Sequence, residues 1–475
     1  MEKYDVVVIG AGPGGYPAAI RAAQHGASVA VIEKEALGGT CLNWGCIPTK
    51  TLIAASSLYW TMRHVSRFGL SVEKVVFDYA AMLQNKTQVV KKLRAGIAML
   101  LKSNDITCFD GIGSFAGRNR VTVRPAKGKD TLLNSAHTII ATGATTDLPA
   151  FLPKNPRIMD SRAFLDLAQL PQRLTVMGGG VIGCELACMA AQLGVNVTIV
   201  ELLEDILAML DPDLRAVVRQ HMEKQLKIRI LTGKPAESVT AGNSGVKLKI
   251  GDQTIEADLL LAATGRRPMT QGLALDKAGV IPDAKSYIPV DACGQTKAAT
   301  IYAVGDVTGG PQLAHAATAQ GITAAENALG QRRSSGQIVP ACIFTAPEIG
   351  VAGLSEQEAK QQNRTVSIGK FPFMALGRAL AAGEPTGFVK WIVDANTDQL
   401  LGAQACGAHA TELIAEATTA IQAELTAREL AHTIHAHPTL SEAWMEAAHA
   451  VHGACIHAAP KRKNPKPRAP DRKFN

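Results

Sequence analysis

One pattern of glycines and acids occurs twice in this chain, and it constrains the fold more than any other feature. Each copy has an apolar strand, a glycine turn, an Ala-rich helix and a second strand that ends in an acid. The residues are Gly10, Gly12, Gly15 and Glu33 in the first copy, and Gly178, Gly180, Gly183 and Glu201 in the second. The offset is 168 residues both between the first glycines and between the acids. A lone Gly-x-Gly-x-x-Gly is a weak signal, but two complete copies in register predict two Rossmann-like dinucleotide-binding domains.

The chemistry of a dinucleotide explains this choice of residues. The first glycine permits a tight turn, the second lets the backbone approach a pyrophosphate, and the third lets the helix pack on the strand. Free N–H groups at the helix N-terminus then meet the phosphates, and the acid accepts hydrogen bonds from ribose hydroxyls. The plainer alternative is that these glycines only form ordinary tight turns. Two dinucleotide sites in one chain imply that electrons pass between two carriers.

The second site is expected to prefer NAD over NADP. The carboxylate of Glu201 would repel a ribose 2′-phosphate, and no arginine follows it before Arg215. A site for NADP would need such a cation near the end of this strand.

A segment inserted into the first unit contains two unusual cysteines. Thr142 and Gly143 in "TIIATGA" and Gly265 in "LLLAATGRRP" end the two units at matching positions, yet the first unit is longer by about 46 residues. The stretch "GGTCLNWGCIPTK", with Cys41 and Cys46, opens this extra segment.

Three interpretations of this cysteine pair are open. Packing thiols are disfavoured, because the surrounding glycines and proline are poor core formers. A zinc site would need two further ligands at suitable spacing, and no other close Cys/His pair supplies them, so no metal is expected. A redox disulfide beside a helix start is preferred, because the helix dipole stabilises a thiolate there.

The chain is long enough for several domains, and its composition is that of a globular protein. With 475 residues it exceeds one ordinary core, and 47% hydrophobic with 19% charged residues is typical of soluble domains. No apolar run reaches the roughly 18 residues of a membrane helix. The first strand begins near Tyr4, which leaves no room for a signal peptide, so a cytoplasmic location is expected. The other seven cysteines are then expected to be reduced packing residues. Cys184 and Cys188, four apart on one expected helix, leave a second redox pair as the alternative, but buried small residues are preferred.

Most of the net charge of +8 comes from the C-terminus. Residues 458–475 contain seven Lys or Arg against one Asp, so residues 460–475 are expected to form a disordered basic tail. The rest of the chain has no basic stripe, and no nucleic-acid partner is expected.

The chain resembles the flavin-dependent pyridine-nucleotide disulfide oxidoreductases. The resemblance rests on the two glycine motifs, on "GGTCLNWGCIPTK" and on "TIYAVGDVTGGPQLAHAATAQG". "IHAHPTLSEAW" is most similar to the dihydrolipoyl dehydrogenase branch of that family, and the similarity covers about residues 4–457. It implies FAD at the first motif, NAD at the second, and a homodimer formed through the C-terminal domain. It also implies lipoyl domains of 2-oxoacid dehydrogenase or glycine cleavage complexes as partners.

The resemblance assigns roles to further residues. Asp306 and Ala314 would complete the FAD site. Lys50 would lie near the reactive flavin edge, and Glu185 would lie beside the nicotinamide. Of the two paired cysteines, the first would meet the substrate and the second would meet the flavin.

A candidate base lies near the C-terminus. Glu442 follows His437 by five residues, and a carboxylate on one imidazole nitrogen fixes the tautomer and raises the basicity of the other. The residues alone leave His432 and His435 as equal alternatives and also allow an ordinary surface histidine. The resemblance selects His437 and implies that it serves Cys41 of a second chain.

The expected architecture is α/β, with two Rossmann-like dinucleotide-binding domains and an α+β C-terminal dimerisation domain. The expected domains are residues 1–150 (FAD-binding, with the redox disulfide), 151–270 (NAD-binding), 271–345 (central, completing the FAD site) and 346–459 (dimerisation, with the catalytic base).

Three rival functions can be weighed against this one. A glutathione reductase would want arginines after Glu201 for NADPH, and these are missing. A mercuric reductase would want a C-terminal cysteine pair, whereas Cys455 stands alone. A catalytically silent flavoprotein is disfavoured because the paired cysteines and the candidate base are intact.

Overall fold

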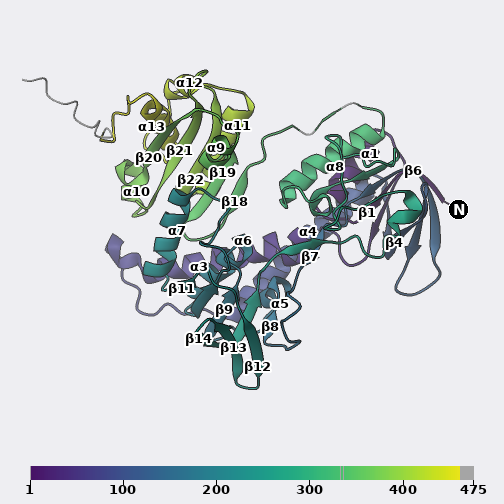
Figure 1. The fold of residues 1–475 in the computed structure, drawn as a ribbon, viewed down its shortest axis with the longest axis horizontal. Helices are drawn as coiled ribbons and strands as arrows, with labels where there is room; N and C mark the ends of the chain where they lie inside the picture. The colour runs from purple at the N-terminus through teal and green to yellow at the C-terminus, as the bar shows by residue number, and fades with distance from the viewer. Residues whose placement is uncertain (1, 332, 335, 460–475) are drawn as a thin grey trace, which may run out of the picture. The chain divides into compact units, whose positions relative to one another are not determined.

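The computed structural model describes residues 2–331, 333–334 and 336–459 (Figure 1). The chain divides into two compact units, with residues 1–209 and 219–339 in unit 1 and residues 210–218 and 340–475 in unit 2. The predicted basic tail at 460–475 lies outside the described residues. Within the described part of the chain, no helix is both long and apolar enough to span a membrane.

The first sheet of unit 1 is mostly parallel and carries the first glycine motif. Its strand order is β3-β2-β1-β6-β5-β4, and β17 also pairs with β6. The pairs formed by β4 with β5 and by β5 with β6 are antiparallel, and the others are parallel. The strands are β1 (Glu2–Ile9), β2 (Val29–Glu33), β3 (Thr107–Asp110), β4 (Ile112–Gly117), β5 (Arg120–Arg124), β6 (Thr131–Ile140) and β17 (Ile301–Ala303).

The second half of strand β1 is buried on both faces, as a central parallel strand requires. Val6 and Val8 belong to one hydrophobic cluster, and Val7 and Ile9 belong to another. Residues of two helices that contact each other contribute to the first cluster. These helices are α1 (Gly15–Gln24) and α8 (Ala314–Ala328).

The second sheet of unit 1 repeats the parallel pattern around the second glycine motif. Its strand order is β11-β10-β9-β15-β8, and its pairings are parallel. The strands are β8 (Ile158–Met159), β9 (Arg173–Met177), β10 (Asn196–Val200), β11 (Arg229–Leu231) and β15 (Leu259–Ala262). The helix after the turn, α6 (Val181–Gln192), is buried along most of its length. The two Rossmann-like units expected from the sequence are both present.

The extra residues of the first unit form helices between β2 and β3. They are α2 (Gly39–Trp44), α3 (Cys46–Arg63), the 3-10 helix η1 (Val65–Phe68) and α4 (Tyr79–Ser103). In the second Rossmann-like half, the described chain between β10 and β11 contains only the helix α7 (Pro212–Lys224). The predicted insertion is therefore confirmed, and the paired cysteines lie in its first two helices.

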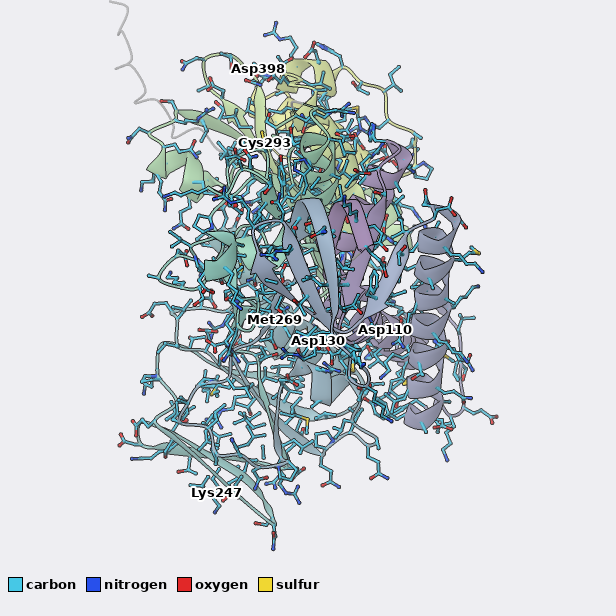
Figure 2. The ribbon with its side chains drawn as sticks, turned by 90° about the vertical axis from the view of Figure 1, so that its right-hand side faces the viewer. Asp110, Asp130, Lys247, Met269, Cys293 and Asp398 are labelled. Atoms are coloured by element: carbon cyan, nitrogen blue, oxygen red, sulfur yellow. A yellow bond between two sulfur atoms is a disulfide. The ribbon has the colours of Figure 1, made fainter. Side chains whose placement is uncertain are left out.

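Two small antiparallel sheets complete unit 1. The first is a meander in which exposed Lys247 pairs with Glu256 at 2.7 Å (Figure 2). Its strands are β12 (Ser238–Gly242), β13 (Gly245–Ile250) and β14 (Gln253–Ala257). In the second, β7 (Ala144–Thr146) pairs with β16 (Arg266–Pro268). This pairing brings together the two segments predicted to end the dinucleotide-binding halves, because β7 follows Gly143 and β16 follows Gly265.

Unit 2 is an antiparallel sheet covered by helices, so it has the predicted α+β architecture. The strand order is β18-β19-β22-β21-β20. The strands are β18 (Ala341–Ile343), β19 (Glu348–Gly353), β20 (Val366–Pro372), β21 (Gly387–Asp394) and β22 (Leu400–Gly407). The helices are α9 (Glu356–Gln361), α10 (Gly377–Ala381), α11 (Ala410–Gln422), α12 (Ala427–Ala431) and α13 (Glu442–Val451).

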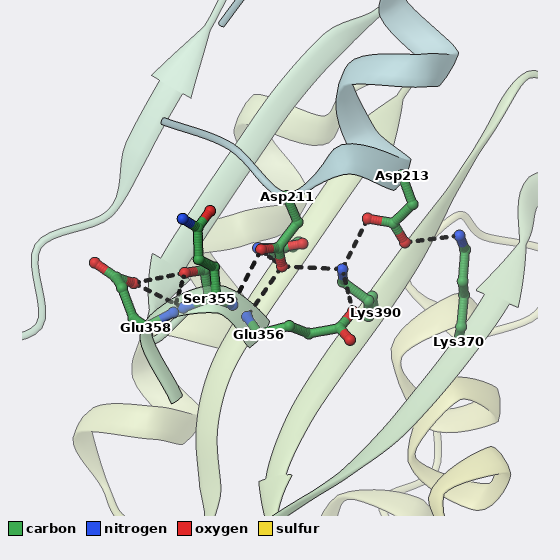
Figure 3. A network of polar contacts seen from close by, with 9 residues as sticks. Asp211, Asp213, Ser355, Glu356, Glu358, Lys370 and Lys390 are labelled. Carbon is green, nitrogen blue, oxygen red and sulfur yellow. Dashed lines mark hydrogen bonds and ion pairs between the residues drawn. The ribbon is translucent and has the colours of Figure 1, made fainter. Parts of the chain in front are cut away.

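A buried lysine holds the segment 210–218 to the sheet of unit 2 (Figure 3). The side chain of Lys390, on β21, is fully buried, and its Nζ donates to Asp211 at 3.1 Å, Asp213 at 2.9 Å and Glu356 at 2.7 Å. Asp211 also accepts the Nε2–H of Gln404 at 2.8 Å. A buried ammonium is tolerated only when it is paired in this way.

The charges of this network reinforce one another. Burial opposes the charged form of Lys390, but its bonds to Glu356 and Asp213 outweigh burial and raise its pKa. The pKa of Asp213 is lowered, because Lys390 and Lys370 outweigh the opposing effect of its burial. The raised lysine pKa contributes stability that is lost only as the pH rises past about 10, and the lowered Asp213 pKa contributes stability that is lost as the pH falls below about 4.

We predict that Lys390→Met lowers the free energy of unfolding of unit 2 by about 3 kcal/mol or more, because buried Asp211 loses its cation. Lys370→Met is the matched control, since Lys370 contacts the same Asp213 at 2.9 Å but is one-third exposed, and it should cost under about 1 kcal/mol. Hydrogen exchange of peptides covering β21 measures both. Equal protection in the two variants would contradict the prediction.

Candidate functional site

The first glycine turn is shaped by close backbone contacts. Gly10 has a φ of +103°, and a Cβ there would overlap the carbonyl group of Ala141, which follows β6. A Cβ on Gly15, the first residue of α1, would overlap the carbonyl oxygen of Gly10. At Gly12 a Cβ would meet only the Cα of Gly39, at 3.7 Å. The first and third glycines are therefore required by packing, and the second is not.

The second glycine turn has the same design. Gly178 has a φ of +109°, and a Cβ there would overlap the carbonyl group of Ala263. A Cβ on Gly183 would overlap the carbonyl oxygen of Gly178. A Cβ on Gly180 would meet nothing within 4 Å. The middle glycine thus keeps open a space that the protein itself does not fill, as a cradle for a phosphate would.

The acids after both turns are fixed by backbone N–H groups. Glu33 accepts a hydrogen bond from Ala11 at 2.8 Å and another from Glu35 at 2.9 Å. Glu201 accepts bonds from the two corresponding positions of its own copy, at 2.5 and 2.8 Å. Each carboxylate therefore lies beside its glycine turn, where the sequence predicted a contact with a ribose. The structural bonds are an additional role that the motif alone does not reveal.

Cys41 and Cys46 form a disulfide, with their Cα atoms 4.6 Å apart. Cys41 lies inside the short helix α2, and Cys46 is the first residue of α3, where the helix dipole favours a thiolate. The sequence predicted the second placement but not the helix around Cys41. In the described residues the remaining cysteines form no disulfide, namely Cys108, Cys184, Cys188, Cys293, Cys342, Cys406 and Cys455.

An ion pair links the disulfide helix to the second glycine motif. Lys50, one turn after Cys46 on α3, donates to both carboxylate oxygens of Glu185 on α6, at 2.8 and 2.7 Å. The side chain of Glu185 is only 4% exposed. The two helices also contact each other along their lengths, and Ser56 donates to Gln192 at 2.7 Å. Two predicted site residues from the two Rossmann-like halves of unit 1 therefore meet in one bidentate contact.

The segments that end the two Rossmann-like halves contain the predicted residues Thr142, Gly143 and Gly265. Thr142 donates its hydroxyl to the carbonyl of Met269 at 2.8 Å, and the carbonyl of Gly143 accepts the Met269 N–H at 2.9 Å (Figure 2). Gly265 has a φ of +153°, and a Cβ there would meet nothing within 4 Å. Ala314 begins α8.

Asp306 lies in the 3-10 helix η3 (Gly305–Thr308) and pairs with Arg266 at 3.4 Å. Burial raises the pKa of Asp306, although Arg266 opposes this shift. The sequence identified Asp306 but not its partner. The only local signal for Arg266 is its position directly after Gly265, in "TGRRP".

The predicted base and its acid are in contact within unit 2. Nδ1 of His437 lies 2.8 Å from the carboxylate of Glu442, and the imidazole is 76% exposed. Partial burial opposes ionisation of Glu442, but the N–H of Thr439 and the imidazole outweigh it and lower its pKa. Glu442 is therefore a carboxylate at neutral pH, and it leaves Nε2 of His437 as the nitrogen available to a substrate.

Two other histidine–carboxylate pairs lie on neighbouring elements. His435 contacts Glu416 of α11 at 2.6 Å, and its side chain is almost fully buried. His457 pairs with buried Glu446, one turn after Glu442 on α13. His437 is thus the exposed imidazole of "HAH", which distinguishes it from His435 in a way that spacing does not.

Two family models match this chain. The model described as pyridine nucleotide-disulphide oxidoreductase matches residues 4–321, and the model of the dimerisation domain of the same enzymes matches residues 339–448.

Proteins and solved structures similar to the chain cover nearly its whole length. A dihydrolipoyl dehydrogenase of Chlamydia pneumoniae is 43% identical over 97% of this chain and 99% of its own. One of Halobacterium salinarum is 41% identical over 95% and 97%. The solved structure of LpdA from Mycobacterium tuberculosis is 30% identical, with a TM-score of 0.88 over 94% of this chain and 99% of that one. The HOCl-induced flavoprotein disulfide reductase RclA from Escherichia coli, in its Cu(II) complex, is 29% identical, with a TM-score of 0.86 over 94% and 99%.

We predict that two alanine substitutions in the second turn separate binding from folding. Gly180→Ala has room in the protein but fills the phosphate space, so NADH affinity should fall by about tenfold or more with little change in thermal stability. Gly183→Ala overlaps the carbonyl of Gly178 and should cost about 1–3 kcal/mol of stability. Titration of NADH fluorescence and thermal unfolding check the pair. Unchanged NADH affinity in Gly180→Ala would show that no phosphate of NADH binds at this turn.

Proposed function

Because the chain belongs to the pyridine nucleotide-disulphide oxidoreductase family, we propose that it oxidises protein-bound dihydrolipoyl groups to lipoyl groups with NAD⁺ as acceptor, the activity of a dihydrolipoyl dehydrogenase. The observation that carries the proposal is the Cys41–Cys46 disulfide at the start of α3. Relatives of this name at 41–43% identity over nearly the full chain support the choice of substrate.

The two glycine turns fit the two cofactors of the family, FAD and NAD. Each turn leaves open the side at its middle glycine and packs tightly at the other two. We assign FAD to Gly10, Gly12, Gly15, Glu33, Lys50, Thr142, Gly143, Asp306 and Ala314, and NAD to Gly178, Gly180, Gly183, Glu185, Glu201 and Gly265. When bound, FAD would accept an electron pair from the protein thiols, and NAD⁺ would be the final acceptor of that pair.

The chain's own residues perform thiol–disulfide exchange. Nε2 of His437, oriented by Glu442 at Nδ1, takes the proton of a dihydrolipoyl thiol. The resulting thiolate attacks Sγ of Cys41, so that a mixed disulfide forms and Cys46 leaves as a thiolate. The second substrate thiol then attacks the substrate sulfur bonded to Cys41, so that the lipoyl disulfide closes and Cys41 leaves and takes up the proton of that thiol. The chain is left with the Cys41 thiol, the Cys46 thiolate and a proton on His437.

The chain has the dimerisation domain of its family and is a homodimer on that basis. We propose that His437 of one chain serves Cys41 of the other, and that lipoyl domains of a 2-oxoacid dehydrogenase or glycine cleavage complex bring the substrate. The exposed imidazole of His437, held by Glu442 of its own chain, supports a role toward a second chain.

A cytoplasmic location is the proposal for this chain. The bacterial and archaeal relatives at 41–43% identity support it, since their names carry no organelle, whereas the Arabidopsis thaliana relative at 39% identity is named as mitochondrial. Subcellular fractionation with an antibody to the chain tests it, and recovery in a membrane-enclosed organelle would contradict it.

The activity test is reduction of NAD⁺ by dihydrolipoamide, with glutathione disulfide and NADPH as the alternative pair. We predict strong preference for NAD⁺ over NADP⁺, because Glu201 repels a 2′-phosphate. Glu201→Gln should narrow the ratio of kcat/KM values for NAD⁺ and NADP⁺, since it removes the charge and keeps an acceptor oxygen for one of the two backbone N–H groups. If the chain reduced glutathione disulfide with NADPH and did not oxidise dihydrolipoamide, the proposed function would be wrong and that of a glutathione reductase would replace it.

The shared site has a direct complementation test. Cys41→Ser and His437→Gln homodimers should each lose dihydrolipoamide turnover by several orders of magnitude. Mixed dimers of the two chains should regain activity, because one of their two sites has an intact disulfide and an intact base. The control is a mixture of Cys41→Ser with Cys46→Ser chains, in which both sites lack a cysteine of the pair. Mixed dimers of the first kind that stay inactive would place each site in a single chain.

A further inference from the structure

The short helix α2, which carries Cys41, is held from outside by an arginine on α4. The amide Nδ2 of Asn43 donates to the carbonyls of Leu37 at 3.0 Å and Gly39 at 2.9 Å, so it ties the helix to its own start. Its Oδ1 accepts two bonds from Arg94, from Nε at 2.9 Å and from Nη2 at 2.6 Å. Both polar ends of Asn43 are therefore satisfied, one within the loop and one by Arg94.

A second arginine holds the next residue of α2. The guanidinium carbon of Arg162, on α5 (Ser161–Leu165), lies 4.0 Å from the centroid of the Trp44 ring. The same guanidinium pairs with Glu35 at 3.0 Å, just after the end of β2. A planar guanidinium stacks on an aromatic face and binds a carboxylate at the same time, which a lysine ammonium does less well. Helix α2 indeed packs against both α4 and α5.

These contacts matter because the joint between the cysteines is a glycine. Gly45 separates α2 from α3, and a Cβ there would meet the carbonyl oxygen of Thr40 at 2.9 Å, so the close turn requires a glycine. A glycine joint by itself lets α2 move when the disulfide opens. A dithiol whose backbone stays in place re-forms its disulfide more readily, because less conformational freedom is gained on reduction.

We propose that Arg94 and Arg162 are positioning residues for the redox pair, and that they shift its thiol–disulfide equilibrium toward the disulfide by holding α2 in both oxidation states. The inference rests on the proposed redox role of Cys41 and Cys46. Neither arginine touches the cysteines in any contact described for the chain, so each acts through Asn43 or Trp44.

The test is equilibration of the holoenzyme with dithiothreitol under anaerobic conditions. One dithiothreitol dithiol becomes its cyclic disulfide as the Cys41–Cys46 disulfide becomes two thiols, so the exchange is balanced. Acid quenching followed by maleimide labelling counts the free thiols, which are seven in the oxidised chain and nine in the reduced chain. We expect Arg94→Met and Arg162→Met each to shift the equilibrium constant toward the dithiol by about threefold to tenfold. Arg162→Lys should show a smaller shift, since it keeps the charge near Glu35 but not the stacked plane.

The matched control is Arg173→Met. Arg173 pairs with Asp258 at 2.8 Å and is 47% exposed, against 3.0 Å and 48% for Arg162 with Glu35, but it lies on β9. The thiol–disulfide equilibrium constant of the Arg173→Met variant should stay within about twofold of that of the unsubstituted protein. Unchanged constants in both Arg94→Met and Arg162→Met, or an equal shift in the control, would overturn the proposal. The measurement needs neither dihydrolipoamide nor NAD⁺, so a failure here is separate from a failure of the proposed function.

Discussion

The architecture of unit 1 depends on a backbone contact that tolerates no side chain. In both halves the third glycine of the turn lies so close to the carbonyl oxygen of the first that any Cβ would overlap it, as Gly15 with Gly10 and Gly183 with Gly178 show. This contact sets how closely the first helix approaches its strand. The middle glycine then faces open space, and the acid at the end of the next strand is fixed beside the turn. A packing constraint and a binding cradle are therefore produced by the same few residues.

Two copies of this arrangement become one redox system through a helix of the inserted segment, α3, and the helix of the second copy, α6. α3 starts with Cys46, α6 starts beside Gly180, and the two helices are joined by the bidentate pair of Lys50 with Glu185. The buried carboxylate of Glu185 pairs with a cation from the other half, and this pair ties the positions of the two halves together. The inserted segment thus supplies both the thiols and the connection to the second dinucleotide site.

Local patterns predicted much of this arrangement. Glycine spacing predicted both turns, the acids and the strand–helix–strand order, and the excess length of the first unit predicted the insertion that holds Cys41 and Cys46. Contacts between distant residues left no such signal. The pairing of Arg94 with Asn43 and the network around Lys390 join residues 51 and up to 193 positions apart, and no spacing rule connects them. The choice of His437 also came from resemblance rather than from the residues themselves.

The network around Lys390 has a consequence for how the polypeptide becomes a folded protein. Asp211 and Asp213 leave the ribosome long before β21, and the contact between Asp211 and Lys390 closes a loop of 179 residues that contains residues 219–339 of unit 1. Closing so long a loop is entropically costly unless the intervening chain has already collapsed. During synthesis from the N-terminus, the carboxylates of Asp211 and Asp213 therefore stay solvated and without Lys390 while unit 1 folds. The C-terminal sheet matures last, and it does so on a segment made much earlier.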